Sequence, residues 1–441
     1  MTGPANILDH YRDAHAQLVP EFAGGEWAAS LRSKALERLL KRGLPTTRDE
    51  DWKYTSLRPI ARHAFQYSGQ VPTEADAGTI DRHTLSGFDN WRLVFVNGRY
   101  TPALSDVVNF DGLTVRPLAD VLEQDPAHVQ SALDTFSQRD GDPFLLLNSA
   151  FIESGLVIDL EKGASVPRPI YILMLSSGDD RLVCHPRILL RAGQSSKLTL
   201  IEHYAGDAAN FTNVVANIDL AGQAQIEHYR INVEGPEAAH ISGTHVNVSR
   251  DARYINHNFC LGGRLVRNDI NVALSEPGAE TELNGLYLLD GKAHVDNHTT
   301  IDHIAPMTRS AEDYRGVLRD RSRAVYNGKV IVREDAQKTD AWQSNRNLLL
   351  SDAAEVDTKP ELEIYADDVK CGHGATVGQL DKDALFYLLS RGIDHDTASS
   401  LLIFAFVDDV IARGSLDEIR RQLEKWAIGR LPDATRIEEF V

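Results

Sequence analysis

The spacing of apolar residues divides the chain into three zones, and the first, residues 1–110, is predicted to be mostly helical. Residues 26–42 repeat leucine and alanine at every third or fourth position, which is the spacing of an amphipathic helix. Gly43 follows directly and is expected to end that helix. Further on, an apolar run ends at Asn97-Gly98, a pair typical of a tight hairpin turn.

The second zone, residues 143–380, alternates short β-branched and aromatic runs with glycine, asparagine and aspartate, and a connector at residues 111–142 precedes it. The tetrapeptide IEHY occurs at residues 201–204 and again at 226–229, an offset of 25 residues (226 − 201). Strand-like units with a period of roughly 20–30 residues favour a β-solenoid, in which each coil buries its inner face against the next. A β-sandwich has similar short strands and is the alternative.

The third zone, residues 381–441, returns to helical spacing. Three helices are predicted, at residues 381–392, 397–413 and 415–429. Asp381 is suited to be the N-cap of the first helix, and Gly392 to end it. Ser415 and Glu418 have the spacing of a capping box for the third helix. The zone is therefore predicted to be a separate helical domain.

One face of the second of these helices is apolar beyond what a small helical unit buries alone. The face consists of Leu401, Leu402, Ala405, Phe406, Val407 and Ile411. Most of it is expected to form the core of the helical domain. A docking face for another protein is the alternative.

Composition and charge exclude several classes of protein. The chain has 441 residues and a formal net charge of −18, which would repel the phosphates of a nucleic acid. The N-terminus lacks the apolar stretch of a signal peptide, and the longest apolar run, residues 401–407, is too short to cross a membrane. The three cysteines are widely separated and include no CxxC pair. We therefore expect a cytoplasmic protein without nucleic-acid or membrane partners.

Motifs for nucleotide chemistry are missing from the sequence. No GxxxxGK[ST] loop and no GxSxG elbow occurs. Two pairs of carboxylates, Asp335 with Asp340 and Glu361 with Glu363, resemble the pair that glycosidases use. Many β-solenoids degrade polysaccharides in this way, so a carbohydrate-active solenoid enzyme is the alternative function.

Cys371 and His373 are the first candidate metal ligands. They lie in the sequence KCGHG, and on a strand two residues separated by one position point to the same side. A thiolate and an imidazole together suit iron, zinc or copper. Two ligands do not complete a site, so others must come from elsewhere. A buried cysteine with a hydrogen-bonded histidine at a glycine turn is the structural alternative.

A second polar row occurs in the sequence HVDNHTTIDH at residues 294–303. If this segment is extended, His294, Asp296, His298 and Asp302 share one face and could bind a metal. Such a row is more often the solvated outer face of a solenoid strand. The sequence alone leaves both interpretations open.

Several of these segments together resemble one known family, the SufB/SufD family of iron–sulfur cluster assembly proteins. The longest similar segment is residues 335–393, and shorter ones are TRDEDWKYTSL at 47–57, LVFVNGRY at 93–100 and DNHTTIDH at 296–303. The two branches of the family differ in the late motif. KCxHGAT, at residues 370–376 here, is similar to the SufD branch, whereas SufB-like chains have EHEAT there and carry more cysteines.

The resemblance implies a mainly β fold, with a right-handed parallel β-helix core between N-terminal and C-terminal helical domains. It implies a scaffold subunit without enzymatic activity of its own. Its implied partners are SufB, which would pair with the β-helix edge, and the ATPase SufC, which would dock on the C-terminal helices. A transient iron–sulfur cluster would form at the SufB interface, with His373 and, less directly, Cys371 as ligands. The isolated chain would hold no cofactor and could form a homodimer.

Overall fold

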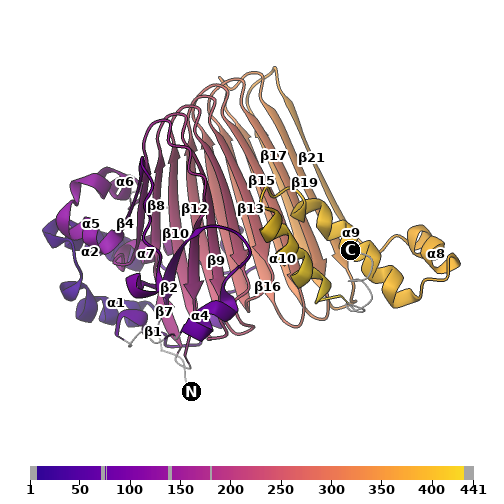
Figure 1. Ribbon diagram of the computed structural model, residues 1–441, viewed down its shortest axis with the longest axis horizontal. Coiled ribbons are helices and arrows are strands. Elements are labelled where there is room, and N and C mark those ends of the chain that lie inside the picture. The colour runs from indigo at the N-terminus through magenta and orange to yellow at the C-terminus, as the bar shows by residue number, and fades with distance from the viewer. Residues whose placement is uncertain (1–6, 71–74, 76, 138–141, 179–180, 432–441) are drawn as a thin grey trace.

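Two long sheets form the centre of the molecule and are shown in Figure 1. The structure is a computed structural model, and it describes residues 7–70, 75, 77–137, 142–178 and 181–431. Sheet A contains β1 (Gln66–Tyr67), β4 (Leu113–Pro117), β5 (Gly155–Leu160), β7 (Leu182–Cys184), β8 (Arg187–Ala192), β10 (Phe211–Leu220), β12 (Ala239–Val248), β14 (Leu265–Leu274), β16 (His294–His303), β18 (Arg323–Val332) and β20 (Glu355–Ile364). Sheet B contains β2 (Trp91–Val96), β3 (Arg99–Tyr100), β6 (Ile170–Leu175), β9 (Lys197–Ala205), β11 (Gln225–Asn232), β13 (Arg253–Cys260), β15 (Glu280–Leu289), β17 (Arg309–Leu318), β19 (Asp340–Leu349) and β21 (Lys370–Gly378).

From β8 to β21, consecutive strands alternate between the two sheets, and neighbours within each sheet are parallel. This arrangement is a β-solenoid, so the mainly β fold with a β-helix core is confirmed and the β-sandwich is excluded. The spacing of successive coils falls within the predicted period of roughly 20–30 residues, but it differs from the 25-residue offset of the IEHY copies. Tyr229 pairs with Ile201, an offset of 28 residues (229 − 201). The recurrence of IEHY therefore does not mark equivalent positions in successive coils, because coil register follows the alternation of buried residues and not local identity.

The space between the sheets is filled by alternate residues of each strand. In β18, Ala324, Tyr326 and Val330 are buried inside, whereas Arg323 and Lys329 point outward. The same alternation along the other strands gives one continuous apolar core. Each coil is thus held by burial against the coils before and after it.

The N-terminal part covers the first strands. Its helices are α1 (Ile7–Leu18), α2 (Gly25–Arg42), α3 (Arg58–Ala61), α4 (Ala77–His83), α5 (Leu118–Gln124), α6 (Ala127–Ser137) and α7 (Pro143–Ala150). The predicted helix at 26–42 and its end at Gly43 are confirmed. Asn97 and Gly98 form the predicted hairpin turn between β2 and β3, with φ of 51° and 77°. Because β2 also pairs with β6, sheet B begins within the zone predicted to be mostly helical.

The C-terminal part consists of α8 (Lys382–Ser390), α9 (His395–Ile411) and α10 (Asp417–Ile428). Asp381 caps α8 as predicted, because its carboxylate accepts hydrogen bonds from the amides of Asp383 and Ala384. The predicted capping box is wrong. Leu416 is the N-cap of α10, and the Ser415 hydroxyl bonds the carboxylate of Glu227 on β11 instead. Residues 432–441 of the predicted domain lie outside the described part of the chain.

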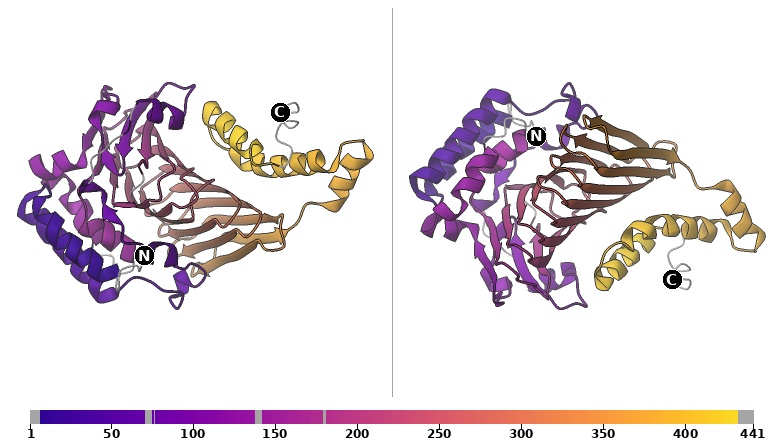
Figure 2. Two further views of the ribbon diagram at one scale, coloured as in Figure 1. Left: turned by 90° about the horizontal axis from the view of Figure 1, so that it is seen from below. Right: turned by 90° about the horizontal axis from the view of Figure 1, so that it is seen from above.

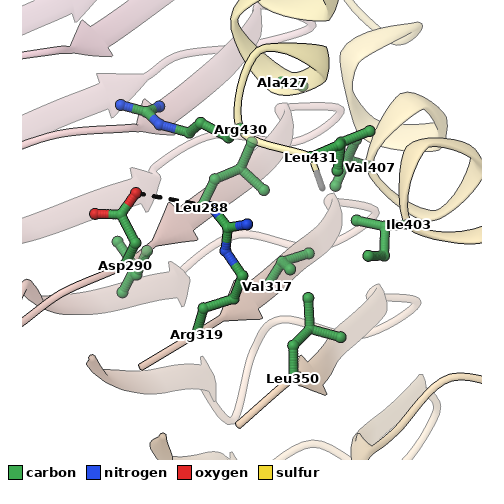
Figure 3. Close-up of a pocket in the computed structure, with 11 residues that line it drawn as sticks. Leu288, Asp290, Val317, Arg319, Leu350, Ile403, Val407, Ala427, Arg430 and Leu431 are labelled. Atoms are coloured by element: carbon green, nitrogen blue, oxygen red, sulfur yellow. Dashed lines mark ion pairs between the residues drawn. The ribbon is translucent and has the colours of Figure 1, made fainter. Parts of the chain in front are cut away.

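Helices α9 and α10 pack on the outer face of sheet B, whereas α8 projects past the last strands (Figure 2). Val407 and Ile411, expected in a helical domain core or a docking face, are buried in a cluster that includes Leu286 and Val317 of sheet B. Figure 3 shows Ile403 and Val407 directed toward Val317 and Leu350, around a cavity of about 20 Å³. No helix in the described residues is long and apolar enough to cross a membrane.

Candidate functional site

Cys371 and His373 lie on β21, the last strand of the β-helix and an edge of sheet B. Cys371 pairs in register with Ala341 of β19, and His373 with Gln343. Ala341 and Gln343 are both buried between the sheets. Because side chains at matching positions point to the same side, Cys371 and His373 share one face, as the sequence predicts, and this face is the inner one of the final coil.

The two side chains have different surroundings. Cys371 is half-buried and packs against the apolar core, while His373 is exposed. Burial raises the pKa of the Cys371 thiol above its ordinary value. Since the thiolate is the form that binds metal, this cysteine is a weak ligand until a metal ion or another cation approaches.

Behind His373, the inner face continues as a row of polar side chains. Gln343 donates a hydrogen bond of 3.2 Å to Glu312 of β17. Glu312 also accepts hydrogen bonds from Thr299, at 2.6 Å, and from Tyr326, at 3.0 Å. Burial raises the pKa of Glu312. Sequence reasoning missed Glu312, although the alternation Ser310, Glu312, Tyr314 could have placed it on the inner face.

Within the described residues, no three histidine, cysteine, aspartate or glutamate side chains are placed together as a metal site. Among the described residues, the final coil therefore offers a thiol and an imidazole without a third such ligand beside them.

Edges β20 and β21 are both long, with 10 and 9 residues, and neither has a further strand beside it in the described structure. Several large apolar side chains are exposed on and beside them. Trp342 is 58% exposed, and Ile364, Tyr365 and Val377 are also exposed. Gly372 lets the Trp342 ring lie close to the backbone of β21, because a Cβ there would be 2.6 Å from the ring. Such an edge is a template for pairing with another strand.

The second predicted row, residues 294–303, is not solvated along its whole length, and the N-terminal segment covers its start. Asp296 is buried and accepts hydrogen bonds from Arg267, at 2.8 Å, and from Thr55, at 2.5 Å. Although burial opposes it, His298, Arg267 and Thr55 hold the pKa of Asp296 well below its usual range. The Arg267 guanidinium also lies 3.9 Å from the centroid of the Trp52 ring.

Other side chains of the row also contact residues of the same chain. His294 Nε2 is 2.9 Å from the Thr55 hydroxyl, and Asp302 binds Arg333 at 2.8 Å. The row is thus a fastening between the N-terminal segment and sheet A, and not the metal site considered from the sequence. The outer carboxylates Glu361 and Glu363 are each 2.6 Å from a lysine ammonium, of Lys359 and Lys329 respectively.

Helix α8 carries apolar side chains that nothing in the described residues covers. Phe386 is 71% exposed, and Tyr387 and Leu389 are exposed as well. No residue of α8 is buried. The uncovered apolar surface of the C-terminal helices therefore lies mainly on α8, and not on the second helix, where the sequence offered a docking face as the alternative to a core.

Comparison with known proteins identifies the family. The model described as "SufBD protein N-terminal region" matches residues 3–172, and "SUF system FeS cluster assembly, SufBD core domain" matches residues 174–406. The chain belongs to the SufB/SufD family. The core match contains Cys371, His373 and the whole of α8, so the open end of the β-helix lies within the part shared with the family.

The curated relatives of this SufB/SufD family member agree with the SufD branch. The iron–sulfur cluster assembly protein SufD of Escherichia coli is 34% identical over 91% of this chain and 92% of its own length. An iron–sulfur cluster assembly SufBD family protein of Synechocystis is 31% identical over 89% of each chain. SufD of Bacillus subtilis is 24% identical over 90% of this chain and 92% of its own. The resemblance inferred from KCxHGAT is thereby confirmed.

Proposed function

We propose that this protein is a cytoplasmic scaffold subunit of the SUF system, and that its open coil binds the nascent iron–sulfur cluster together with a second subunit. The single observation that carries the proposal is the position of Cys371 and His373 on the inner face of the unpaired edge strand β21. The cluster is the cargo of the complex, and the chain alone lacks a full ligand set among its described residues.

SufB is the proposed partner at this edge. Strands β20 and β21 offer two parallel rows of backbone donors and acceptors, and a related β-helix could continue both sheets. The exposed side chains of Trp342, Tyr365 and Val377 would then be buried. Continuing the sheets would also carry the partner's side chains to Cys371 and His373, which accounts for an incomplete site on this chain.

Charge on β20 favours a different chain as partner over a second copy. Glu355, Asp357, Glu361 and Glu363 point outward from this strand, with Lys359 among them. In an antiparallel self-pairing centred on Lys359, Glu361 would oppose Asp357 and Glu363 would oppose Glu355. Like charges opposite one another destabilise a strand pair. Homodimers of the isolated chain are therefore expected to be weaker than its complex with SufB.

The ATPase SufC is the proposed partner of the C-terminal helices, with α8 as its contact. The exposed Phe386, Tyr387 and Leu389 form an apolar surface on a helix that stands apart from the β-helix. The sequence has no nucleotide-binding loop of its own, so coupling to ATP hydrolysis requires a separate subunit. In this arrangement the chain contributes to iron acquisition by holding ligands and is not itself an enzyme.

The test compares His373→Ala, Cys371→Ser and the matched control His395→Ala, an exposed histidine on α9. The full-length variants are coexpressed with SufB and SufC, and complex recovery and melting temperature are measured. Each variant is also tested for rescue of a strain that lacks this gene. His373→Ala is expected to form a stable complex that fails to rescue, because one cluster ligand is lost. His395→Ala is expected to rescue fully.

Two results would reject the ligand role. Full rescue by both Cys371→Ser and His373→Ala would show that neither side chain is needed for cluster formation. Loss of the complex, or a clear fall in melting temperature, in His373→Ala would assign that histidine to structure. In the second case the failure to rescue would follow from instability.

A further inference from the structure

A basic cleft lies between the N-terminal segment and one corner of the β-helix. Its volume is about 590 Å³, within the usual size range of small-ligand sites. Arg58 and Arg62 come from the N-terminal wall, on and beside α3. Arg264, Lys292 and Arg321 come from the opposite wall, in the turns before β14, β16 and β18.

The corner wall repeats a cation in successive coils. Arg264 precedes β14 by one residue, and Lys292 and Arg321 each precede their strands by two. Adjacent parallel strands are about 4.8 Å apart, so these three side chains form a ladder of positive charge. Arg323 and Arg181 add two more cations, which brings the lining to seven, against one carboxylate, that of Glu237. The whole chain has the opposite balance, with 46 basic and 64 acidic residues.

Intramolecular ion pairs do not account for the cluster. Arg323 pairs with Glu355, but among the described residues Arg58, Arg62 and Arg321 make no ion pair with a carboxylate. All three are exposed and free to turn toward a ligand. Like charges gathered without counter-charges repel one another, so the arrangement costs stability unless an anion is bound.

The histidines of the cleft respond to the same field. Burial and then the Arg181 guanidinium lower the pKa of His63. Burial is also the main cause that lowers the pKa of His294, and Arg323 and Arg264 contribute. Both imidazoles are therefore neutral near pH 7, and that of His63 can donate a hydrogen bond to an anion without adding to the repulsion, while His294 Nε2 stays with the Thr55 hydroxyl.

We propose that this cleft binds a small molecule carrying a diphosphate or triphosphate group. Guanidinium groups bind phosphate oxygens in pairs of parallel hydrogen bonds, and cations on two facing walls suit more than one phosphate. A long polyanion fits less well, because beyond the cleft it would meet a chain whose net charge is −18. Tyr54 lies at the rim, 39% exposed, where it can contact the remainder of the ligand.

Titration calorimetry of the full-length protein with inorganic pyrophosphate tests the proposal. Binding is expected at about 50 mM salt, and it should weaken at about 200 mM because screening shortens the reach of the cluster. Arg62→Ala and Arg321→Ala, one from each wall, should each weaken binding by about tenfold, and the double variant by more. Arg309→Ala is the matched control, because Arg309 is similarly exposed at the start of β17 but outside the cleft.

Two further variants keep the test independent of folding defects. Arg321→Lys retains the charge but loses the paired geometry, so binding should weaken by less than in Arg321→Ala. Glu237→Gln removes the one carboxylate of the lining and should tighten binding about threefold. Melting curves without ligand check that each variant is folded.

Four outcomes would overturn the proposal. One is the absence of pyrophosphate binding at low salt, and another is binding unchanged in the folded Arg62→Ala/Arg321→Ala protein. Tighter binding of a glutamate-rich peptide than of pyrophosphate would assign the cleft to an acidic protein segment. Tighter binding of single-stranded DNA would assign it to nucleic acid.

Discussion

The first strands of the β-helix are closed by the protein's own chain, whereas the last coil is left open. At the beginning, β4 pairs antiparallel with β5, β3 pairs antiparallel with β2, and N-terminal helices pack on the outer face of sheet A. At the other end, β20 and β21 are unpaired edges with exposed apolar residues beside them. A solenoid needs a cover at each end. This chain supplies one cover, and in our proposal a partner supplies the other, so changes at the closed end should affect stability and changes at the open end should affect assembly.

The largest difference between an effect on stability and an effect on partner binding is expected within the C-terminal helices. Val407→Asp places a charge in the buried contact between α9 and sheet B, and should lower the free energy of unfolding by roughly 4 kcal/mol or more. Phe386→Asp on exposed α8 should change it by less than about 0.5 kcal/mol and yet abolish SufC retention. Urea denaturation and a column-binding assay measure the two effects. Retention of SufC by Phe386→Asp would remove α8 as the docking helix.

Changes at the contact between the N-terminal segment and sheet A should have the next largest effect on the unfolding free energy. Asp296→Ala leaves the buried Arg267 without that carboxylate, and should cost about 3 kcal/mol of unfolding free energy. Thr55→Val removes a single hydrogen bond to Asp296 and should cost about 1 kcal/mol. Chemical denaturation measures both.

A second carboxylate beside Arg267 determines how a small loss of unfolding free energy in these variants would be interpreted. Asp269 lies 2.8 Å from Arg267 and is the counter-charge that remains in Asp296→Ala. Equal, small losses in Asp296→Ala and Thr55→Val would therefore mean that Asp269 alone satisfies the Arg267 guanidinium. The fastening would then contribute little to stability.

Acid should weaken the closed end through a buried histidine. Burial lowers the pKa of His185 to about 3, and the ring stacks on Phe151 and Tyr67. In the unfolded chain this histidine takes up a proton near pH 6.5, whereas in the folded protein it stays neutral down to about pH 3. Stability is therefore lost as the pH falls from about 6.5 to about 3, by about 1.4 kcal/mol per pH unit. His185→Phe should reduce this dependence of the unfolding free energy on pH, which denaturation curves recorded at several pH values in this range measure. An unchanged dependence on pH would contradict the assignment.

The smallest effect on stability is expected at the open edge. Val377→Lys adds a charge beside the β21 edge, and should change the unfolding free energy by less than about 0.5 kcal/mol while preventing recovery of the SufB complex. Val107→Lys is the matched control, because Val107 is 86% exposed and lies before the β-helix in the chain. Copurification with SufB measures how much of the complex each variant forms. Normal recovery of the Val377→Lys complex would place the SufB contact elsewhere.

Local rules predicted the parts of this fold that depend on neighbouring residues. Asp381 caps α8 and Asn97-Gly98 turns between β2 and β3, because each motif is satisfied within a few residues. The capping box failed because Glu227, far away in the sequence, takes the Ser415 hydroxyl. The predicted period of roughly 20–30 residues is confirmed, but the IEHY copies are not in register, because coil register depends on contacts between coils, which tetrapeptide identity does not report.

The candidate site was predictable only in part. Strand alternation put Cys371 and His373 on one face, and the structure adds that this face is the inner one. The link from Gln343 to Glu312 needed the register of three coils, which no pattern within a single strand contains. The basic cleft was hidden for the same reason, since its two walls come from segments far apart in the chain.

The fastening between Thr55 and Asp296 also constrains the order in which the protein can fold during synthesis. Thr55 emerges from the ribosome early, but its partner follows 241 residues later. Lys359, which lies 2.7 Å from Glu50, follows later still. The contact of Thr55 with sheet A must therefore wait until Asp296 has been translated, whereas Trp52 can already pack on Phe144, which is made much earlier. The N-terminal segment can in this way dock in two stages, first on α7 and the early strands and later on β16 and β20.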